Sequence, residues 1–416
     1  MSKRFFVLFI FYFFILGQCN TFLISEARGQ QEQGFSFDVN YRSLRIPVKI
    51  SQNLLVVPMS INNSPPLNFI LDTGVNTTIL TEPIIAHLFS IDVSDLVYVL
   101  GLGSEGIIEA GMARNVTFSM QGITGRNMNM IVLPDGVLSF SEIFGFPVHG
   151  IIGYDFFREF PVEVNYRRKF IKVYQEPTYR IRRRSTVVPL IMENNKPYIE
   201  VSVMGKDSVK VDSLKLLVDM GATNPVFLNS SFKHLTPKRI PAYLGKGISG
   251  ELVGEMGRLQ YLEIEDFVID APLVAYPEEE FLTLANLKFE WQGILGGGIL
   301  SRFRFIIDYG SKKLVMRKNN SFRKPFEHNM SGIEVIARGA SFSEYFISYV
   351  RENSIAHEKD IRPGDQIIRI MNKQTARVTL DEIVGILNQE PGTVIHLEIL
   401  RGDDIYRKVI TLREDI

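Results

Sequence analysis

Short apolar runs separated by turn residues make up most of residues 40–318. Runs rich in Val, Ile and Phe alternate with Gly, Asn and Pro, and no long segment has apolar residues at helical spacing. This pattern predicts a mainly β structure. The expected strands are 54–60, 116–120, 162–164, 170–174, 198–203, 216–218, 259–264, 305–307 and 314–316. Short helices are expected at 154–160 and 299–303.

The pattern changes after residue 318. Residues 319–329 are polar and contain Pro325, which predicts a linker. A helix is expected to begin near Thr379, because its hydroxyl can cap the helix and Glu382 stands at the third helical position. Strands are expected at 332–337, 345–350, 394–400 and 406–412. Residues 330–416 are therefore interpreted as a separate small α+β module.

Three pairs of segments recur in the same order, 143 to 147 positions apart, which indicates an internal duplication. A unit of about 140 residues is therefore present twice. We place the first unit at 40–178 and the second unit at 185–318, with a basic connector at 179–184. The paired segments are 69–74 (FILDTG) with 216–221 (LLVDMG), 100–106 (LGLGSEG) with 244–250 (LGKGISG), and 150–153 (GIIG) with 293–296 (GILG).

The chain begins with the features of an export signal. Lys3 and Arg4 precede an apolar run of 12 residues, 5–16, which is too short for a bilayer span of about 20 residues. Cleavage after Gly29 would remove a signal peptide at 1–29. The protein is then expected in the periplasm, outside the cell or at the cell surface.

Other outcomes for this N-terminal segment remain open. Residues 16–19 resemble a lipoprotein box, so lipid attachment at Cys19 would tether the protein to a membrane. A retained membrane anchor is a further alternative. If the signal is cleaved, residues 30–39 form an N-terminal linker before the first unit.

Composition excludes several classes of protein. The 46 Lys and Arg residues equal the 46 Asp and Glu residues, and this neutral sum argues against nucleic acid as the main partner. A hydrophobic content of 45% excludes disorder as the overall state. One cysteine allows neither a disulfide framework nor a Cys-based zinc site. The six histidines lack HExxH spacing, so no metal site is expected.

The duplicated segments place one aspartate in each unit at matching positions. Asp72 follows an apolar strand and precedes Thr73 and Gly74, and Asp219 stands at the same place before Met220 and Gly221. A pseudo-twofold arrangement would bring the two loops together. Two carboxylates about 3 Å apart cannot both ionise, so such a pair shares one proton. One carboxylate can then activate a water while the other protonates a carbonyl, and no metal, cofactor or covalent nucleophile is required.

These motifs resemble the two lobes of pepsin-like and retropepsin-like aspartic proteases, over roughly residues 40–318. The resemblance implies two β-barrel-like lobes related by a pseudo-twofold axis, with Asp72 and Asp219 as the catalytic pair. It also implies supporting loop roles for Thr73, Gly74, Met220 and Gly221. The segment resembling the tip of the flap, the hairpin that closes over substrate, comprises Leu100, Gly101, Leu102, Gly103 and Ser104.

The chain departs from the family pattern in two places. Met220 stands where a Thr or Ser hydroxyl is expected, so one of two symmetric cross-loop hydrogen bonds is lost. Such a bond contributes about 1 kcal/mol net. Leu100 stands at the place of the pepsin flap tyrosine, which the retroviral relatives also lack.

Residues 332–412 resemble a PDZ domain. The turn Arg362-Pro363-Gly364-Asp365 is similar to the Pro-Gly-Asp turn of that family. The resemblance implies that a C-terminal peptide binds as an added strand, with its carboxylate held by backbone N–H groups. It places the carboxylate-binding loop at Glu344, Tyr345, Phe346 and Ile347.

Two functions fit these observations. The first is an exported aspartic endopeptidase that cleaves extended peptides or unfolded protein segments and carries a PDZ-like module for peptide or partner binding. The second is a catalytically degenerate protein of the same fold that binds peptides or acts as a scaffold.

Overall fold

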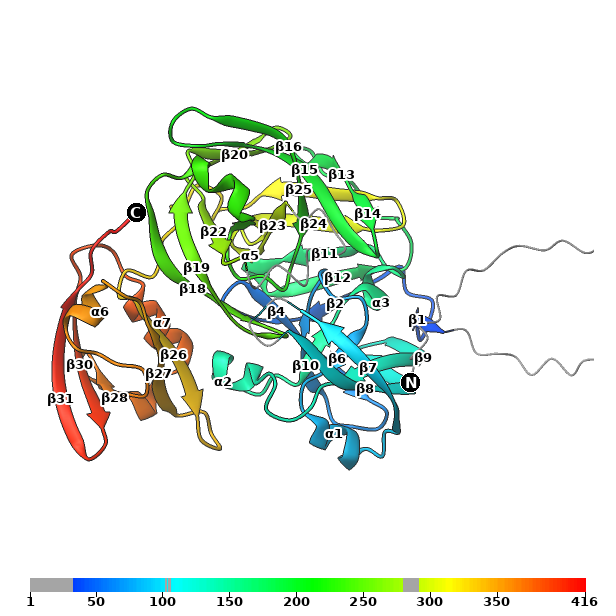
Figure 1. Cartoon of the computed structure of the whole chain (residues 1–416). Coiled ribbons are helices and arrows are strands. Elements are labelled where there is room, and N and C mark those ends of the chain that lie inside the picture. Colours follow the sequence, from blue (N-terminus) through cyan, green and yellow to red (C-terminus); the bar gives the residue numbers. More distant parts are fainter. Residues whose placement is uncertain (1–32, 102, 104–105, 280–291) are drawn as a thin grey trace, which may run out of the picture. The chain divides into compact units, whose positions relative to one another are not determined.

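The computed structural model describes residues 33–101, 103, 106–279 and 292–416, so the expected signal peptide and Cys19 lie outside the described residues. The first unit folds into a nine-stranded sheet (Figure 1). Its strands are β1 (Gly34–Phe37), β3 (Lys49–Ser51), β4 (Leu54–Ile61), β5 (Leu67–Leu71), β6 (Thr78–Leu80), β7 (Val93–Leu100), β8 (Ile107–Met120), β9 (Ile123–Val132) and β10 (Gly150–Ile152).

The second unit folds into a ten-stranded sheet. Its strands are β14 (Ile191–Glu193), β15 (Lys196–Met204), β16 (Lys210–Val218), β17 (Val226–Leu228), β18 (Arg239–Gly247), β19 (Gly250–Arg258), β20 (Tyr261–Ile264), β21 (Phe267–Asp270), β22 (Leu273–Pro277) and β23 (Gly293–Leu295). The strands expected at 54–60, 116–120, 198–203 and 216–218 lie within these bounds, and the one expected at 259–264 begins later, at Tyr261.

The two sheets share one pairing scheme. In the first unit, β10 runs parallel to β5 and antiparallel to β6. In the second unit, β23 runs parallel to β16 and antiparallel to β17. Each three-residue strand is thus inserted between two neighbours, and all of its residues are buried. The internal duplication inferred from sequence is therefore a duplication of topology.

A third sheet of six strands contains strands from both units. At its centre β11 pairs antiparallel with β24, with Val162 opposite Ile307 and Asn165 opposite Arg304. The apolar core is continuous across the two units. In order across the sheet, the strands are β13 (Thr186–Pro189), β25 (Lys313–Lys318), β24 (Phe303–Asp308), β11 (Val162–Asn165), β12 (Phe170–Tyr174) and β2 (Ser43–Pro47).

A buried ion pair joins the two units in this sheet. The guanidinium of Arg304 donates to Glu163, whose side chain is only 5% exposed, and the hydroxyl of Tyr174 donates to the same carboxylate at 2.7 Å. A buried carboxylate is stable only when it is paired and hydrogen-bonded in this way.

Helices are few and short within the described residues. The first unit contains α1 (Pro83–Leu88), α2 (Phe140–Phe144) and α3 (Tyr154–Phe157), and the second contains α5 (Gly297–Leu300). The expected helix at 154–160 ends earlier, at Phe157. The expected helix at 299–303 was wrong in its bounds, because Phe303 already belongs to β24. None of the described helices is long and apolar enough to span a membrane.

The C-terminal module has its own sheet and its own core (Figure 1). Thr379 and Glu382 form the expected capping box at the start of α7. Strand β26 lies at one edge of the sheet, beside β27. The elements are β26 (Ile333–Arg338), β27 (Glu344–Val350), α6 (Ile355–Glu358), β28 (Gln366–Ile370), β29 (Lys373–Gln374), α7 (Leu380–Leu387), β30 (Val394–Arg401) and β31 (Asp404–Thr411).

Two sequence predictions are corrected by these elements. Residues 34–37, placed in an N-terminal linker, form strand β1 and pair with β9, so that Phe35 packs on Phe118 and Phe156. Glu344, Tyr345, Phe346 and Ile347, placed in a carboxylate-binding loop, lie in strand β27, where their backbone pairs with β26 on one side. The backbone N–H groups of a paired strand are already used in the sheet, so this segment is not a loop that captures a carboxylate.

The Glu163 pair gives a stability prediction. We expect Glu163→Ala to lower the free energy of unfolding by about 3 kcal/mol, because it leaves Arg304 and the Tyr174 hydroxyl without their partner. Urea unfolding measures the change, with the exposed Glu200→Ala as the control. A loss within about 0.5 kcal/mol of the control would contradict this role.

Candidate active site

Two loops, one after β5 and one after β16, hold the aspartates at matching places. The backbone N–H of Asp72 donates to the carbonyl of Ile152 at 2.9 Å, and the N–H of Asp219 donates to the carbonyl of Leu295 at 3.0 Å. Strands β10 and β23 therefore support the two loops in the same way. This is why each unit carries an apolar-apolar-Gly segment about 80 residues after its aspartate.

The structure brings Asp72 and Asp219 together. Their carboxyl groups lie within hydrogen-bonding reach of each other. The N–H of Gly74 donates to Asp72 Oδ1 at 2.6 Å, and the N–H of Gly221 donates to Asp219 Oδ1 at 2.8 Å. Each aspartate is thus oriented by the glycine two residues later in its own loop.

The same glycines leave room for the opposite carboxylate. A Cβ at Gly74 would lie 3.1 Å from Asp219 Oδ2, and a Cβ at Gly221 would overlap Asp72 Oδ2. Any other residue at position 221 would push the two loops apart. The two loops approach each other so closely that only glycine fits at the third position of each motif.

Burial raises the pKa of Asp72 well above its ordinary value, and the charge and hydrogen bond of Asp219 raise it further. Asp72 is 8% exposed. The N–H of Gly74 and the charge of Lys196 oppose the shift but do not cancel it. The pair therefore retains one proton over a range in which an exposed aspartate is ionised.

Thr73 connects the two loops from beneath. Its hydroxyl donates to the carbonyl of Val218 at 2.6 Å and accepts from the N–H of Met220 at 3.0 Å. Thr73 is fully buried, so both bonds are shielded from water. One side chain of the first unit thus fixes the second loop at two backbone atoms.

Met220 cannot make the symmetric bonds from the other side. Its side chain is fully buried and belongs to the continuous apolar core. It fills the space with apolar atoms in place of a hydroxyl. The loops are therefore joined by one hydroxyl bridge, as the sequence indicated.

Tyr309 was not predicted as a site residue from sequence. Burial raises the pKa of its hydroxyl well above the ordinary value, and the charges of Asp72 and Asp219 add to the effect. Among the described residues its hydroxyl has no hydrogen-bond partner. Its ring contacts Phe157 and Tyr154, with ring centres 5.6 and 6.0 Å away. Tyr309 therefore places a neutral, buried phenol near enough to the two aspartates for their charges to affect its pKa.

The tips of two hairpins meet each other. The N–H of Gly101, at the end of β7, donates to Ser249 Oγ at 3.0 Å between β18 and β19. Gly103 has a φ of +141°, and a Cβ there would overlap the backbone of Ser249. Leu102 and Ser104, assigned to the flap tip from sequence, lie outside the described residues. The described Gly101 and Gly103 thus lie against the turn between β18 and β19.

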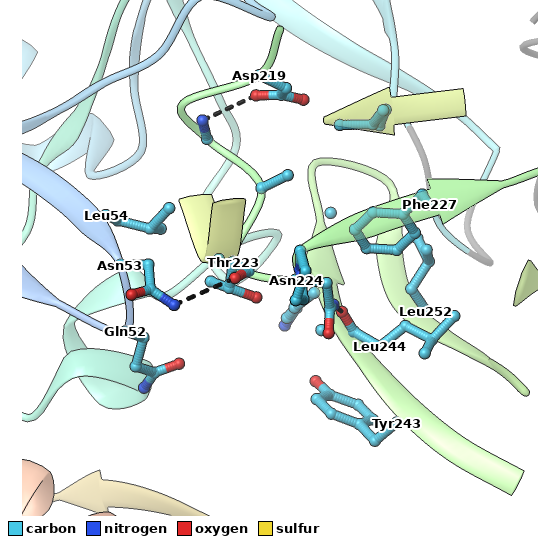
Figure 2. A pocket seen from close by; sticks show the side chains of 18 of the residues that line it. Gln52, Asn53, Leu54, Asp219, Thr223, Asn224, Phe227, Tyr243, Leu244 and Leu252 are labelled. Carbon is cyan, nitrogen blue, oxygen red and sulfur yellow. Dashed lines mark hydrogen bonds between the residues drawn. The ribbon is translucent and has the colours of Figure 1, made fainter. Parts of the chain in front are cut away.

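A cavity of about 920 Å³ contains both aspartates. Figure 2 shows Asp219 in it with Leu54 of the first unit and Phe227, Leu244 and Leu252 of the second. Apolar side chains line both sides, including Phe140, Phe144, Ile151, Leu217 and Ile294. Leu100 and Gly101 also line it, whereas residues 344–347 are not among its lining residues.

Comparisons with known families agree with this geometry. Residues 57–156 match the aspartyl protease family, and residues 346–401 match the PDZ domain family. A search of curated proteins found no match. The resemblance to an aspartic protease followed by a PDZ domain, and the mainly β fold class, are therefore confirmed.

The hydroxyl bridge gives a first prediction for the site. We expect Thr73→Val to lower the free energy of unfolding by about 1–3 kcal/mol, because the buried Val218 carbonyl and Met220 N–H lose their partner. Thr73→Ser keeps the hydroxyl and is expected to retain most of the stability. Thermal and urea unfolding of the two variants measure the difference, and equal losses would show that the hydroxyl does not join the loops.

The raised pKa of Asp72 gives a second prediction. The folded state binds this proton more tightly than the unfolded state, so the contribution to stability is present below about pH 3.8 and is lost as pH rises through the folded pKa. Asparagine does not titrate, so in Asp72→Asn no stability is lost at this position as the pH rises. We expect the melting temperature of Asp72→Asn, relative to wild type, to increase as the pH rises from below 3.8 toward neutrality.

Asp212 provides a control of opposite sign. Hydrogen bonds from Ser202 and Lys210 lower the pKa of Asp212, so its contribution appears only as the pH rises. The melting temperature of Asp212→Asn relative to wild type should therefore fall, slightly, over the same pH range. A pH-independent difference for Asp72→Asn would contradict the raised pKa.

Proposed function

We propose that this protein hydrolyses peptide bonds as an aspartic endopeptidase. The supporting observation is a pair of carboxyl groups on matched loops, within hydrogen-bonding reach of each other, in a cavity that contains apolar walls from both units. The match of residues 57–156 to the aspartyl protease family supports the same assignment.

The geometry favours a division of roles between the carboxyl groups. In this mechanism Asp72, whose pKa is raised by burial and by Asp219, acts as the acid, and Asp219 acts as the base. Asp219 takes a proton from a water whose oxygen forms a bond to the scissile carbonyl carbon. Asp72 donates its proton to the carbonyl oxygen, which gives a neutral tetrahedral diol. The diol then collapses as one hydroxyl returns its proton to Asp72, the C–N bond breaks, and Asp219 gives its proton to the leaving nitrogen.

The cavity suits an extended peptide. Leu54, Phe140 and Phe144 line it from the first unit, and Leu217, Phe227 and Ile294 line it from the second. Large apolar side chains on either side of the scissile bond would be removed from water there, at about 25 cal/mol per Å² of apolar surface. Extended peptides and unfolded segments expose such side chains, whereas folded proteins bury them.

A peptide-binding protein without catalysis is the second candidate. The observation that favours it is Met220, which leaves the loops with one hydroxyl bridge. A looser pair of loops would keep the cavity and its apolar walls while holding the carboxyl groups less firmly.

The PDZ-like module is proposed to bind a peptide or a protein partner. Edge strand β26 is where a peptide strand could add. This edge also faces the first unit, since Arg338 lies 3.7 Å from Glu142 of α2, and Ser51 donates to Asp381 of α7 at 2.8 Å. A peptide added to β26 would therefore meet α2 of the first unit.

We also propose that the protein is exported. The support is the basic start followed by a short apolar run, and Cys19 as a site of lipid attachment stays the alternative. The intact mass of the protein purified from its native membrane and soluble fractions separates the two, because only lipidation leaves Cys19 as an acylated first residue.

Peptide cleavage tests the proposed function. We expect wild type to cleave a peptide library, and Asp72→Asn or Asp219→Asn to reduce kcat by about 10²-fold to 10⁴-fold, because each removes one of the two proton-transfer groups. Asp207→Asn, on the exposed surface, is the control. Equal and negligible cleavage by all four proteins, with peptide binding retained, would establish the non-catalytic alternative.

A further inference from the structure

Lys196 occupies the structural counterpart of Leu54. Leu54 is the first residue of β4 and Lys196 is the first residue of β15. Each follows a two-residue turn with positive φ, Gln52-Asn53 in the first unit and Asn194-Asn195 in the second. The hairpin registers agree as well, since Leu54 pairs with Ser51 and Lys196 pairs with Glu193. The duplicated fold therefore places an apolar residue and a cation at the same point of its two units.

Both side chains line the cavity that contains the aspartates. Lys196 lies near enough to Asp72 for its positive charge to lower the pKa of that carboxyl group. Lys196 is half-buried, so its ammonium is partly removed from water. The positive charge of Lys196 therefore interacts with any charged group that enters the cavity.

Lys196 forms no ion pair within the part of the chain that the structure describes. Glu193, which stands opposite it in the hairpin, is bound instead by Lys215 at 2.8 Å. Lys215 also lies over the ring of Tyr198, 5.5 Å from its centre, and is held outside the cavity lining. The cation at 196 is thus left available to an incoming carboxylate.

The charges of the cavity differ between the two units. Apart from Asp72, the first-unit residues that line it are uncharged. The second unit contributes Lys196, Lys246 and Arg302 besides Asp219. The guanidinium of Arg302 already donates to the backbone carbonyls of Ser321 and Pro325. The first-unit side of the cavity therefore suits apolar substrate groups, and the second-unit side offers positive charge to an anion.

We propose that Lys196 forms a cationic subsite that selects an acidic side chain of the peptide, on the second-unit side of the scissile bond. This inference rests on the proposed function and adds a substrate class to it: peptides with an apolar residue on one side of the bond and Asp or Glu on the other. Lys196 acts on specificity and takes no part in bond cleavage.

The size of the preference follows from the exposure of the pair. A partly exposed ion pair contributes up to about 1 kcal/mol, so we expect a preference of about twofold to fivefold for Glu over Gln at the favoured position. Added salt screens such a pair, so the preference should decrease as NaCl rises from low to high concentration.

The test uses two matched sets of short peptides with a central Leu-Phe bond. Glu, or Gln in the second set, is placed in turn at each position on either side of that bond. The ratio of kcat/KM for the Glu and Gln peptides is measured at pH 6, where Glu is ionised. Because each ratio is internal to one protein, partial misfolding of a variant does not affect it.

Three variants distinguish the outcomes. All variants are made in the full-length protein. Lys196→Leu, which copies Leu54, is expected to reduce the Glu/Gln ratio of kcat/KM to about one. Lys196→Glu is expected to reverse the preference, so that the ratio falls below one. Lys206→Glu changes the same charge on the exposed surface of the second unit and should keep the wild-type ratio. A ratio near one at every position in wild type, or a ratio unchanged in Lys196→Glu, overturns the inference while cleavage itself still supports the proposed function.

A binding assay keeps the inference testable without cleavage. Fluorescently labelled Glu and Gln peptides are titrated against Asp72→Asn and against Asp72→Asn with Lys196→Leu, and anisotropy is measured. Tighter binding of the Glu peptide that disappears with Lys196→Leu supports the subsite even if wild type cleaves neither peptide, in which case only the proposed function fails. Equal binding of both peptides by both proteins overturns the subsite.

Discussion

Two carboxyl groups held within hydrogen-bonding reach, one of them almost fully buried, are the constraint on which the rest of the structure depends. Both cannot ionise at once without a large electrostatic penalty, so the site is stable only while it retains a proton. In the proposed mechanism, that proton provides the pair with an acid and a base in one place. The hydrogen bonds around Asp72 and Asp219 hold together two carboxyl groups that would otherwise repel each other.

The elements that support the carboxyl groups are duplicated because each unit holds one of the two aspartates. Ile152 and Leu295 accept from the two aspartate N–H groups, and Gly74 and Gly221 donate to the two carboxylates. The mixed sheet then joins the units through β11 and β24. The symmetry is incomplete at two places. Thr73 has no hydroxyl counterpart at Met220, and Leu54 has a cation, Lys196, as its counterpart.

Much of this structure could be predicted from short motifs in the sequence. The repeated Asp-x-Gly and apolar-apolar-Gly segments identified the duplication, and the capping box at Thr379 located a helix, because each depends on residues close together in the chain. Features that depend on distant pairing were missed or misplaced. Strand β1 pairs with β9, which lies about 90 residues away, and nothing in its four residues indicates that partner. Residues 344–347 were assigned to a loop by motif position, yet strand pairing on β26 decides their structure. No sequence motif contains Lys196. Only the fold brings it near enough to Asp72 for its charge to affect the pKa of that carboxyl group.

The most direct measurement is a pH titration of the Asp72 carboxyl carbon by NMR, in wild type and in Asp219→Asn. If the two groups share a proton, the pKa of Asp72 lies well above 3.8 in wild type and falls when the charge of Asp219 is removed, although burial keeps part of the shift. An Asp72 pKa that is the same in both proteins would contradict a shared proton and, with it, the proposed acid–base chemistry.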